Sequence, residues 1–224
     1  LGYNPIASGI SSFAFGREAV ASDENTFAAG YRSKATGSRS TALGYNVQAT
    51  GQYAAAIGTS NTSSGQYSYT FGTAQTASGL GAVSIGTSTN IASGPASVII
   101  GSYGDTKNFR GAMLLIDDQY FYGVNGPVEA TAENQMTMRF VNGYRLFTDQ
   151  FNSLGVSLGA SANSWSTISD STRKENFKAI DKEDLLRKIS LMKLTTWNYK
   201  TQDAKHYRHY GPMAQEFYSL FGND

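Results

Sequence analysis

A glycine recurs every 14 residues through the first part of the chain, and this repeat restricts the possible folds more than any other feature. The series comprises Gly2, Gly16, Gly30, Gly44, Gly58, Gly72 and Gly86, and Gly101 follows after one extra residue. A second series lies halfway between and comprises Gly9, Gly37, Gly51, Gly65, Gly79 and Gly94, with Asp23, also a turn former, in the position that lacks glycine. A fixed period with two turns per repeat is typical of a solenoid.

The residues before each glycine of the first series alternate between bulky and small side chains. The central position is Ala, Thr or Ser, and the bulky flanking residues include Phe13, Phe15, Phe27, Leu43, Ile57, Phe71 and Ile85. Successive strand residues face opposite sides, so each 14-residue coil contains two short strands, and coils stack at ~4.8 Å. Small residues suit the inside of a narrow roll. The pattern leaves open which stripe faces inward, but two apolar faces on a thin rod favour an oligomer.

Composition excludes several classes of protein. The net charge of +1 gives no electrostatic basis for binding nucleic acid or an anionic membrane. The chain has no cysteine, which excludes disulfides and cysteine-ligated metals. No apolar run approaches the ~20 residues that cross a bilayer, so we expect no membrane insertion. The chain begins inside the repeat without a methionine, and we expect it to be part of a longer protein.

The phased motif A-(S/T)-G…(S/T)-x-A-(I/L/F)-G resembles the head repeat of trimeric autotransporter adhesins over residues 1–103. This resemblance implies a left-handed parallel β-roll in which three identical chains surround one axis. Phage tail-fibre proteins contain the same repeat, so the resemblance does not distinguish a viral from a bacterial fibre.

Residues 104–163 change character and predict a β-rich neck. Short strand-like runs at 112–116, 119–122, 136–140 and 144–147 are separated by turn residues. Asn142-Gly143 predicts a hairpin between the last two runs. Residues 155–160 predict one more strand.

Residues 164–224 predict a small α/β domain, since more than half of the chain's lysines and arginines lie beyond residue 169. An acidic first turn followed by apolar residues at helical spacing predicts a helix over 181–189. Residues 195–200 predict a strand. A second helix is expected from Gly211, with Pro212 near its first turn.

Three separated blocks in this last region resemble the intramolecular chaperone domain at the C-terminus of phage tail fibres and tailspikes. The blocks are Ser169-Asp170-x-x-x-Lys174-x-Asn176, then Trp197-Asn198-Tyr199, then His209-x-Gly211-x-Met213-Ala214-Gln215-Glu216. The resemblance implies a trimerisation module that assists folding and then releases itself. It places the cut between Ser169 and Asp170, with Ser169 as nucleophile and Lys174 as base. Asn176, His209, Gln215 and Glu216 become supporting residues. The family continues into a longer helical coil, so we expect this copy to be truncated.

The residue types fit that chemistry. A serine hydroxyl can attack a backbone carbonyl to give an ester that water opens. A lysine amine accepts the hydroxyl proton only when it is neutral, which requires burial in the folded domain. The alternative for Ser169-Asp170 is a helix N-cap or turn. His206 and His209, with no cysteine nearby, favour packing or hydrogen bonding over metal binding.

We therefore predict a mainly β protein: a trimeric parallel β-solenoid shaft, a β-rich neck and a small α/β chaperone domain. The expected function is a homotrimeric fibre, on a virion tail or a cell surface, that attaches to an unidentified receptor, which could be a glycan. One alternative is a bacterial adhesin that keeps the C-terminal domain uncleaved as a trimer clamp. Another is a polysaccharide-degrading tailspike, but adjacent Asp117 and Asp118 would point to opposite faces of a strand. We expect no cofactor, no metal and at most a single-turnover self-cleavage.

Overall fold

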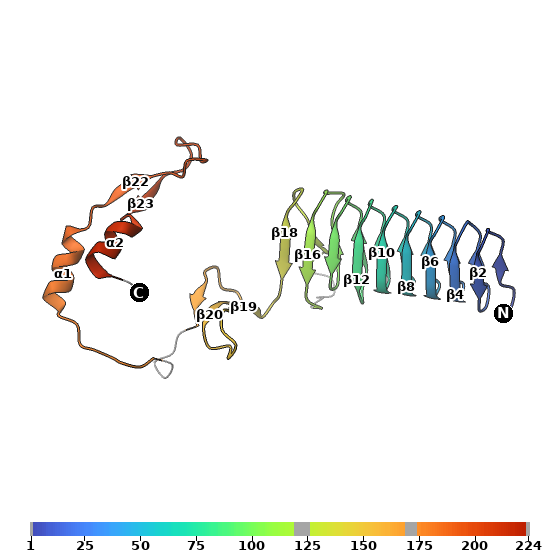
Figure 1. Ribbon diagram of the computed structural model, residues 1–224, viewed down its shortest axis with the longest axis horizontal. Coiled ribbons are helices and arrows are strands. Elements are labelled where there is room, and N and C mark those ends of the chain that lie inside the picture. The colour runs from blue at the N-terminus through green and yellow to red at the C-terminus, as the bar shows by residue number, and fades with distance from the viewer. Residues whose placement is uncertain (1, 119–125, 169–173, 223–224) are drawn as a thin grey trace. The chain divides into compact units, whose positions relative to one another are not determined.

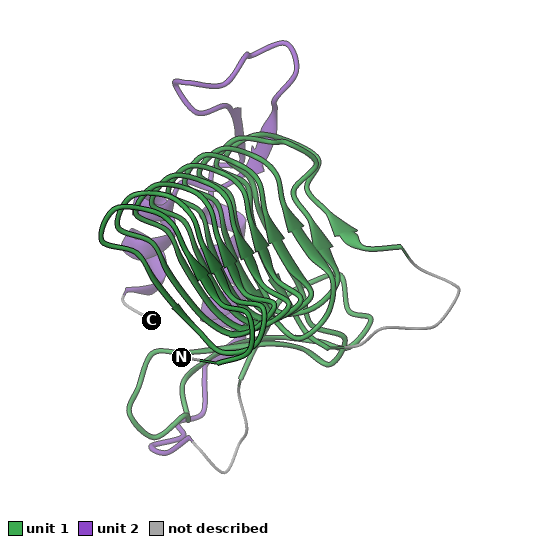
Figure 2. Ribbon diagram, turned by 90° about the vertical axis from the view of Figure 1, so that its right-hand side faces the viewer, with its two compact units in different colours: residues 1–168 green, residues 169–224 purple. Residues whose placement is uncertain are grey.

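The computed structural model describes residues 2–118, 126–168 and 174–222. The chain forms two compact units, an N-terminal unit of residues 1–168 and a C-terminal unit of residues 169–224 (Figure 2). Ser169 and Asp170, the predicted cleavage site, lie outside the described residues.

Two parallel sheets of nine strands each form the solenoid of the N-terminal unit (Figure 1). The odd sheet contains β1 (Ile6–Ala7), β3 (Val20–Ala21), β5 (Lys34–Ala35), β7 (Gln48–Ala49), β9 (Thr62–Ser63), β11 (Gln75–Ala77), β13 (Asn90–Ala92), β15 (Gly104–Asp105) and β17 (Val128–Glu129). The even sheet contains β2 (Phe13–Phe15), β4 (Phe27–Tyr31), β6 (Thr41–Tyr45), β8 (Ala55–Thr59), β10 (Tyr69–Thr73), β12 (Val83–Gly86), β14 (Val98–Ile100), β16 (Met113–Ile116) and β18 (Met136–Arg139). The chain alternates between the sheets, which confirms the predicted solenoid.

Small side chains fill the inside of the coils. Ala28, Ala42 and Ala56 are fully buried at the central position of successive even strands, and the larger Ile99 and Leu114 take this position in later coils. The bulky neighbours in each strand point outward. This arrangement settles the question that the repeat pattern left open.

Both glycine series are required by the stacking of the coils. At Gly58, φ is +121° and an added Cβ would lie 2.1 Å from the carbonyl oxygen of Gly72 in the next coil. At Gly51, in the second series, an added Cβ would lie 2.1 Å from the carbonyl oxygen of Gly65. A side chain at either position would therefore push successive coils apart.

A left-handed residue occurs at every seventh position and closes each half-coil, a feature that the sequence did not predict. The non-glycine members of this series are Asn4, Ser11, Glu18, Asn25, Arg32, Arg39, Asn46, Tyr53, Ser60, Tyr67 and Ala74, with φ between 49° and 60°. Gly81 continues the series with φ 65°. The side chains differ in type, so no residue preference marks the position.

The solenoid extends beyond residue 103, where the predicted neck was expected to begin. β15 pairs with β17, and β16 pairs with both β14 and β18, all in parallel. The glycine period is lost because the later coils are longer: Val98 pairs with Met113, and Met113 pairs with Met136, which is 23 residues further on. Strand pairing therefore continues where the sequence period does not.

The last part of the N-terminal unit is an antiparallel sheet of β19 (Gly143–Phe147), β20 (Gly155–Gly159) and β21 (Ser166–Thr167). The predicted hairpin at Asn142-Gly143 is wrong, because β18 joins the solenoid while β19 pairs with β20. The predicted strand at 155–160 is confirmed as β20.

The C-terminal unit contains α1 (Lys182–Leu191), β22 (Thr195–Trp197), β23 (His209–Gly211) and α2 (Ala214–Phe221). Both predicted helices and the predicted strand are confirmed. Asp181 caps α1, since its carboxylate accepts hydrogen bonds from the backbone N–H groups of Glu183 and Asp184. α2 begins after Pro212-Met213 and ends at Gly222, where φ is 79°. β22 and β23 form an antiparallel pair.

Candidate functional site

The predicted cleavage machinery is only partly within the described residues. Lys174, the predicted base, is exposed within its own chain. Asn176 is also exposed and has a left-handed backbone with φ 59°. Among the described residues, no hydrogen bond joins Lys174 or Asn176 to His209, Gln215 or Glu216. The desolvation that a neutral lysine requires is therefore not provided by the described part of a single chain.

His209 belongs to an aromatic cluster at the β22–β23 pair. Its ring stacks on Trp197, directly opposite in the register, with centroids 4.5 Å apart, and Tyr199 meets both rings at an edge. His209 Nε2 lies 3.0 Å from Gln202 Oε1, and this oxygen also accepts the backbone N–H of Tyr199. The contacts hold the loop between the two strands and give His209 a structural role.

Trp197 contributes an unusual polar group to this cluster. Its indole Nε1 is buried and has no hydrogen-bond partner among the residues that the structure describes. A buried donor without an acceptor destabilises a fold by roughly 1–3 kcal/mol. This donor is enclosed by residues of its own unit.

Glu216 and Gln215 lie in the first turn of α2. A carboxylate oxygen of Glu216 accepts a hydrogen bond from the backbone N–H of Lys193 at 3.0 Å, which ties α2 to the segment after α1. Gln215 is exposed. The predicted supporting residues are therefore not gathered into one site within the described part of the unit.

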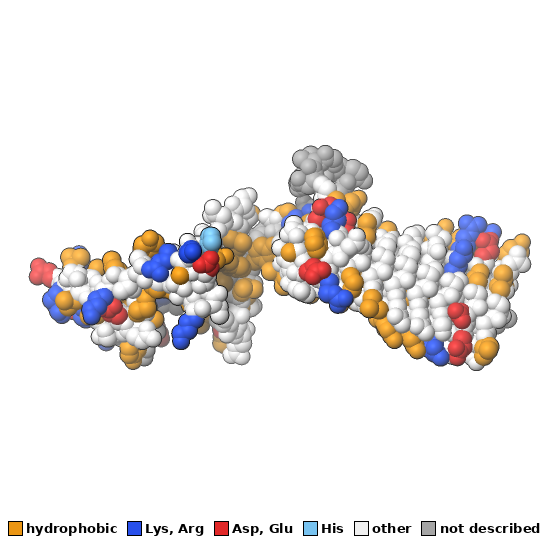
Figure 3. Space-filling view, turned by 90° about the horizontal axis from the view of Figure 1, so that it is seen from above, with side chains coloured by type: hydrophobic (Ala, Val, Ile, Leu, Met, Phe, Trp, Pro, Cys, Tyr) orange, Lys and Arg blue, Asp and Glu red, His pale blue; other side chains and the backbone are white. Residues whose placement is uncertain are grey.

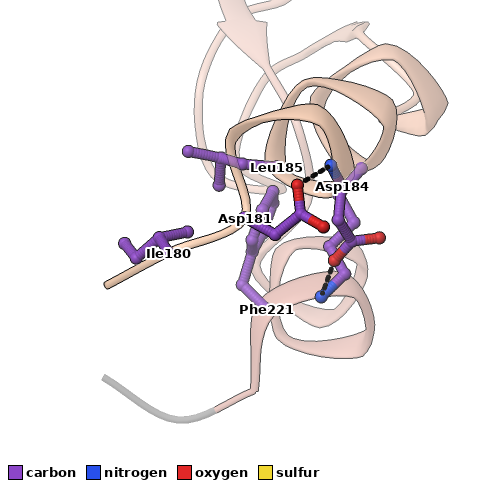
Figure 4. A pocket seen from close by; sticks show the side chains of 6 residues that line it. Ile180, Asp181, Asp184, Leu185 and Phe221 are labelled. Atoms are coloured by element: carbon purple, nitrogen blue, oxygen red, sulfur yellow. Dashed lines mark hydrogen bonds and ion pairs between the residues drawn. The ribbon is translucent and has the colours of Figure 1, made fainter. Parts of the chain in front are cut away.

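A shallow pocket lies between the start of α1 and the end of α2 and is lined by Ile180, Asp181, Asp184, Leu185, Lys188 and Phe221 (Figure 4). Asp184 forms ion pairs with Lys188 at 3.0 Å and with Arg187 at 2.6 Å. These partners lower the pKa of Asp184, the hydrogen bond from Arg187 having the largest effect. Both acidic side chains of the pocket are already engaged, Asp181 as the cap of α1 and Asp184 in ion pairs. The pocket therefore offers no reactive group.

The most consistent property of the C-terminal unit is that its apolar side chains are uncovered. None of the residues described between 174 and 222 is buried. Tyr210 is 81% exposed, Leu194 is 74% exposed and Phe177 is 73% exposed. Exposed apolar residues on α1 and α2 include Leu186, Ile189, Leu191, Phe217 and Tyr218. An apolar surface of this extent marks an interaction surface.

The outer face of the even sheet is also apolar. Its exposed large side chains are Phe13, Phe15, Phe27, Tyr69, Phe71, Ile85, Ile100, Met136 and Met138. The corresponding outward positions of the odd sheet are mostly polar in the central coils, where they hold Lys34, Gln48, Thr62 and Thr76. The two outer faces of the solenoid therefore differ, and the even sheet is the face suited to a partner.

The remaining sequence candidates have structural partners. The carboxylate of Asp117 accepts hydrogen bonds from Arg139 Nε at 3.1 Å and from the backbone N–H of Val141 at 2.8 Å. His206 lies 2.5 Å from Asp203, and the described residues contain no group of three or more potential metal ligands. Neither described helix has the length and apolar character that crossing a bilayer requires.

Comparison with known families supports the organisation of the chain. Residues 169–223 match a family model described as chaperone of endosialidase. Residues 7–33, 25–46 and 49–68 match the YadA head domain repeat. Both resemblances drawn from the sequence are thereby confirmed. No curated protein matches the chain.

Proposed function

We propose that this chain, which joins adhesin-type head repeats to an endosialidase-type chaperone segment, forms a homotrimeric fibre that attaches to a surface. The fibre would belong to a virion tail or to an extracellular appendage. The observation that carries the proposal is that none of the described residues of the C-terminal unit is fully buried within its own chain. Such a unit needs other copies to complete a hydrophobic core.

This dependence supports a role in assembly. A unit of this size is marginally stable even with a complete core. When the apolar side chains of three copies cover one another, folding of the unit becomes linked to trimer formation. The exposed apolar side chains of α1 and α2 fit such a linkage. The module then brings three solenoids together with their even sheets available for contact.

Self-cleavage between Ser169 and Asp170 would release the module after assembly. The Ser169 hydroxyl of one copy attacks the Ser169 carbonyl carbon of a neighbouring copy, since attack on its own carbonyl would close a strained four-membered ring, while the amine of Lys174 takes the hydroxyl proton. The Asp170 nitrogen then leaves with a proton, and water hydrolyses the remaining ester. Lys174 is exposed in one chain, so its desolvation requires neighbouring copies. Cleavage would thus follow correct assembly.

Mass spectrometry of denatured protein tests this step. We expect the freshly expressed chain to yield two fragments that meet at Ser169/Asp170. Ser169→Ala and Lys174→Met should each yield an intact chain, and Ser171→Ala serves as the matched serine control that still cuts. Cleavage in Ser169→Ala would contradict the assignment.

The exposure of Lys174 also favours a second candidate, an adhesin that keeps the module uncleaved as a trimer clamp. A trimer whose wild-type chains all have the intact mass would support this candidate over self-release.

A further inference from the structure

One edge of the solenoid contains a column of stacked side chains at the left-handed position of successive coils. Arg39 lies over the ring of Tyr53, with its guanidinium carbon 5.4 Å from the ring centroid. The rings of Tyr53 and Tyr67 lie within 9° of parallel, with centroids 5.0 Å apart. This distance is close to the spacing of the coils, so each ring presents its two faces to the coils before and after it.

The backbone fixes the spacing of this column. The backbone N–H of Tyr67 donates to the carbonyl of Gln52 at 2.9 Å, and the N–H of Gly81 donates to the carbonyl of Gln66 at 2.8 Å. Tyr53, Tyr67 and Gly81 share nearly the same φ, between 58° and 65°. A side chain at Gly81 would therefore extend the stack by one level.

Gly81 instead leaves that level empty. An added Cβ at Gly81 would meet nothing within 4 Å, whereas at the other described glycines through Gly101 it would lie 1.8–2.3 Å from a backbone oxygen. Coil stacking does not require a glycine here, and Tyr67 shows that a tyrosine can adopt the same backbone conformation. The position after it holds the small residue Ala96. The far face of Tyr67, which is 46% exposed, is consequently open.

The side chains next to this column are uncharged, both polar and apolar. The side-chain amide of Gln66 donates to that of Gln52 at 2.9 Å on the same edge, and the neighbouring Leu80 is half exposed. Residues 40–104 contain no Asp, Glu, Lys, Arg or His. The face of the solenoid in Figure 3 accordingly shows charged side chains near its two ends and none between them. An anionic ligand would find no cation in this part of the chain.

We propose that the open face of Tyr67 above Gly81 binds a neutral sugar ring. The apolar C–H face of a pyranose can pack on an aromatic ring, while its hydroxyls match amide groups that both donate and accept hydrogen bonds. Phosphate, sulfate and sialic acid are anions, and residues 40–104 offer no cationic side chain to bind them. The inference deepens the attachment role proposed above by naming the class of receptor, and it does not depend on self-cleavage.

Saturation-transfer NMR on the full chain tests the site with four neutral probes, cellotetraose, maltotetraose, mannotetraose and chitotriose, and with sialyllactose as the acidic probe. We expect at least one neutral probe to bind, with an affinity that does not change with salt concentration. Gly81→Tyr should fill the empty level, and Tyr67→Ala should remove the ring. Each should weaken binding roughly tenfold or more, the loss of about one aromatic contact.

Tyr45→Ala is the matched control, since Tyr45 stacks on Tyr31 at 4.9 Å on another column and is also exposed. This variant should bind as the wild type does. Failure of all four neutral probes, or unchanged binding by Gly81→Tyr, would overturn the proposal. A preference for sialyllactose that weakens with salt would also overturn it.

Sedimentation of the same samples separates failure of the sugar site from failure of the proposed trimer. A trimer that binds no sugar contradicts only the sugar site, and a changed oligomeric state in Gly81→Tyr would assign the gap to a second copy.

Discussion

The side-chain oxygen of Asn61 accepts a hydrogen bond from the backbone N–H of Gln75, one coil further along the solenoid, at 2.9 Å. The amide of Gln75 in turn accepts from Asn90 Nδ2 at 2.8 Å and donates to the carbonyls of Thr73 and Ser88. All three amide side chains are fully buried. The solenoid thus contains a continuous internal amide ladder that satisfies backbone groups between sheets.

Gln75→Leu should therefore destabilise the solenoid although it replaces a polar core residue by an apolar one. The change leaves the carbonyls of Thr73 and Ser88 without their side-chain donor, and we expect a loss of roughly 3–5 kcal/mol in the free energy of unfolding. Gln66→Leu, at an exposed position, should change it by less than about 0.5 kcal/mol. Urea unfolding of both variants measures the difference, and equal effects would contradict the importance of the ladder.

Gly58 and Gly81 provide a matched pair for the role of glycine. Gly58→Ala places a Cβ against the carbonyl oxygen of the next coil, so we expect a loss on the order of 3 kcal/mol or more. Gly81→Ala meets open space and incurs only the left-handed backbone cost of about 1–2 kcal/mol. Thermal unfolding followed by circular dichroism compares them. A smaller effect at Gly58 than at Gly81 would refute the stacking argument.

Phe71 and Thr76 point outward from the same coil on opposite sheets and test which face meets other copies. Phe71→Asp should weaken association at least about tenfold, because a charge would be buried without a partner in the interface. Thr76→Asp introduces the same charge on the polar face and should leave assembly unchanged. Analytical ultracentrifugation across a concentration series gives the result, and equal dissociation of both variants would exclude the even sheet as the interface.

We predict that the loop held by Asp149 loses hydrogen bonds at low pH. The hydroxyl of Ser153 donates to its carboxylate at 2.6 Å, and the backbone N–H groups of Leu154 and Ser153 donate at 2.8 and 2.9 Å. Chiefly through the Ser153 hydroxyl, these bonds lower the pKa of Asp149 from 3.8 to about 2. The lowered pKa means that the stabilisation is complete above pH 3.8 and is lost as the pH falls through about 2.

Amide chemical shifts of Ser153 and Leu154 during an acid titration measure this transition. Asp149→Asn should remove the titration and give neutral-pH shifts that resemble those of the acidified wild type. A midpoint at the ordinary value for aspartate would show that the carboxylate is not held in this way.

The sequence predicted the solenoid because its main constraint is local and periodic. A glycine such as Gly58 is needed in every coil, and the small residues at Ala42 and Ala56 follow from the narrow interior. The internal ladder was not predictable, since Asn61, Gln75 and Asn90 occupy a position that holds Ser33 and Val47 in earlier coils. Their compatibility with the interior depends on hydrogen bonds between coils, which no single repeat reveals.

The end of the solenoid and the candidate cleavage site were harder to predict for different reasons. Asn142-Gly143 does form a turn, but β18 is paired by the preceding coil, and this long-range contact prevails over the local hairpin signal. The roles of Ser169 and Lys174 come from spacing and resemblance, and they remain predictions. If the site needs three chains, the arrangement of its residues cannot be read from a single chain.

The long coil between Met113 and Met136 has a consequence for how such a fibre can diversify. Parallel pairing is kept on both sides of it, although this coil exceeds the preceding one by eight residues. Extra residues between these two strands are therefore compatible with the parallel pairing of the final strands, β17 and β18. Evolution, or an engineer grafting a recognition loop, can exchange sequence at this point while the scaffold stays constant, so target choice and fibre architecture can change independently.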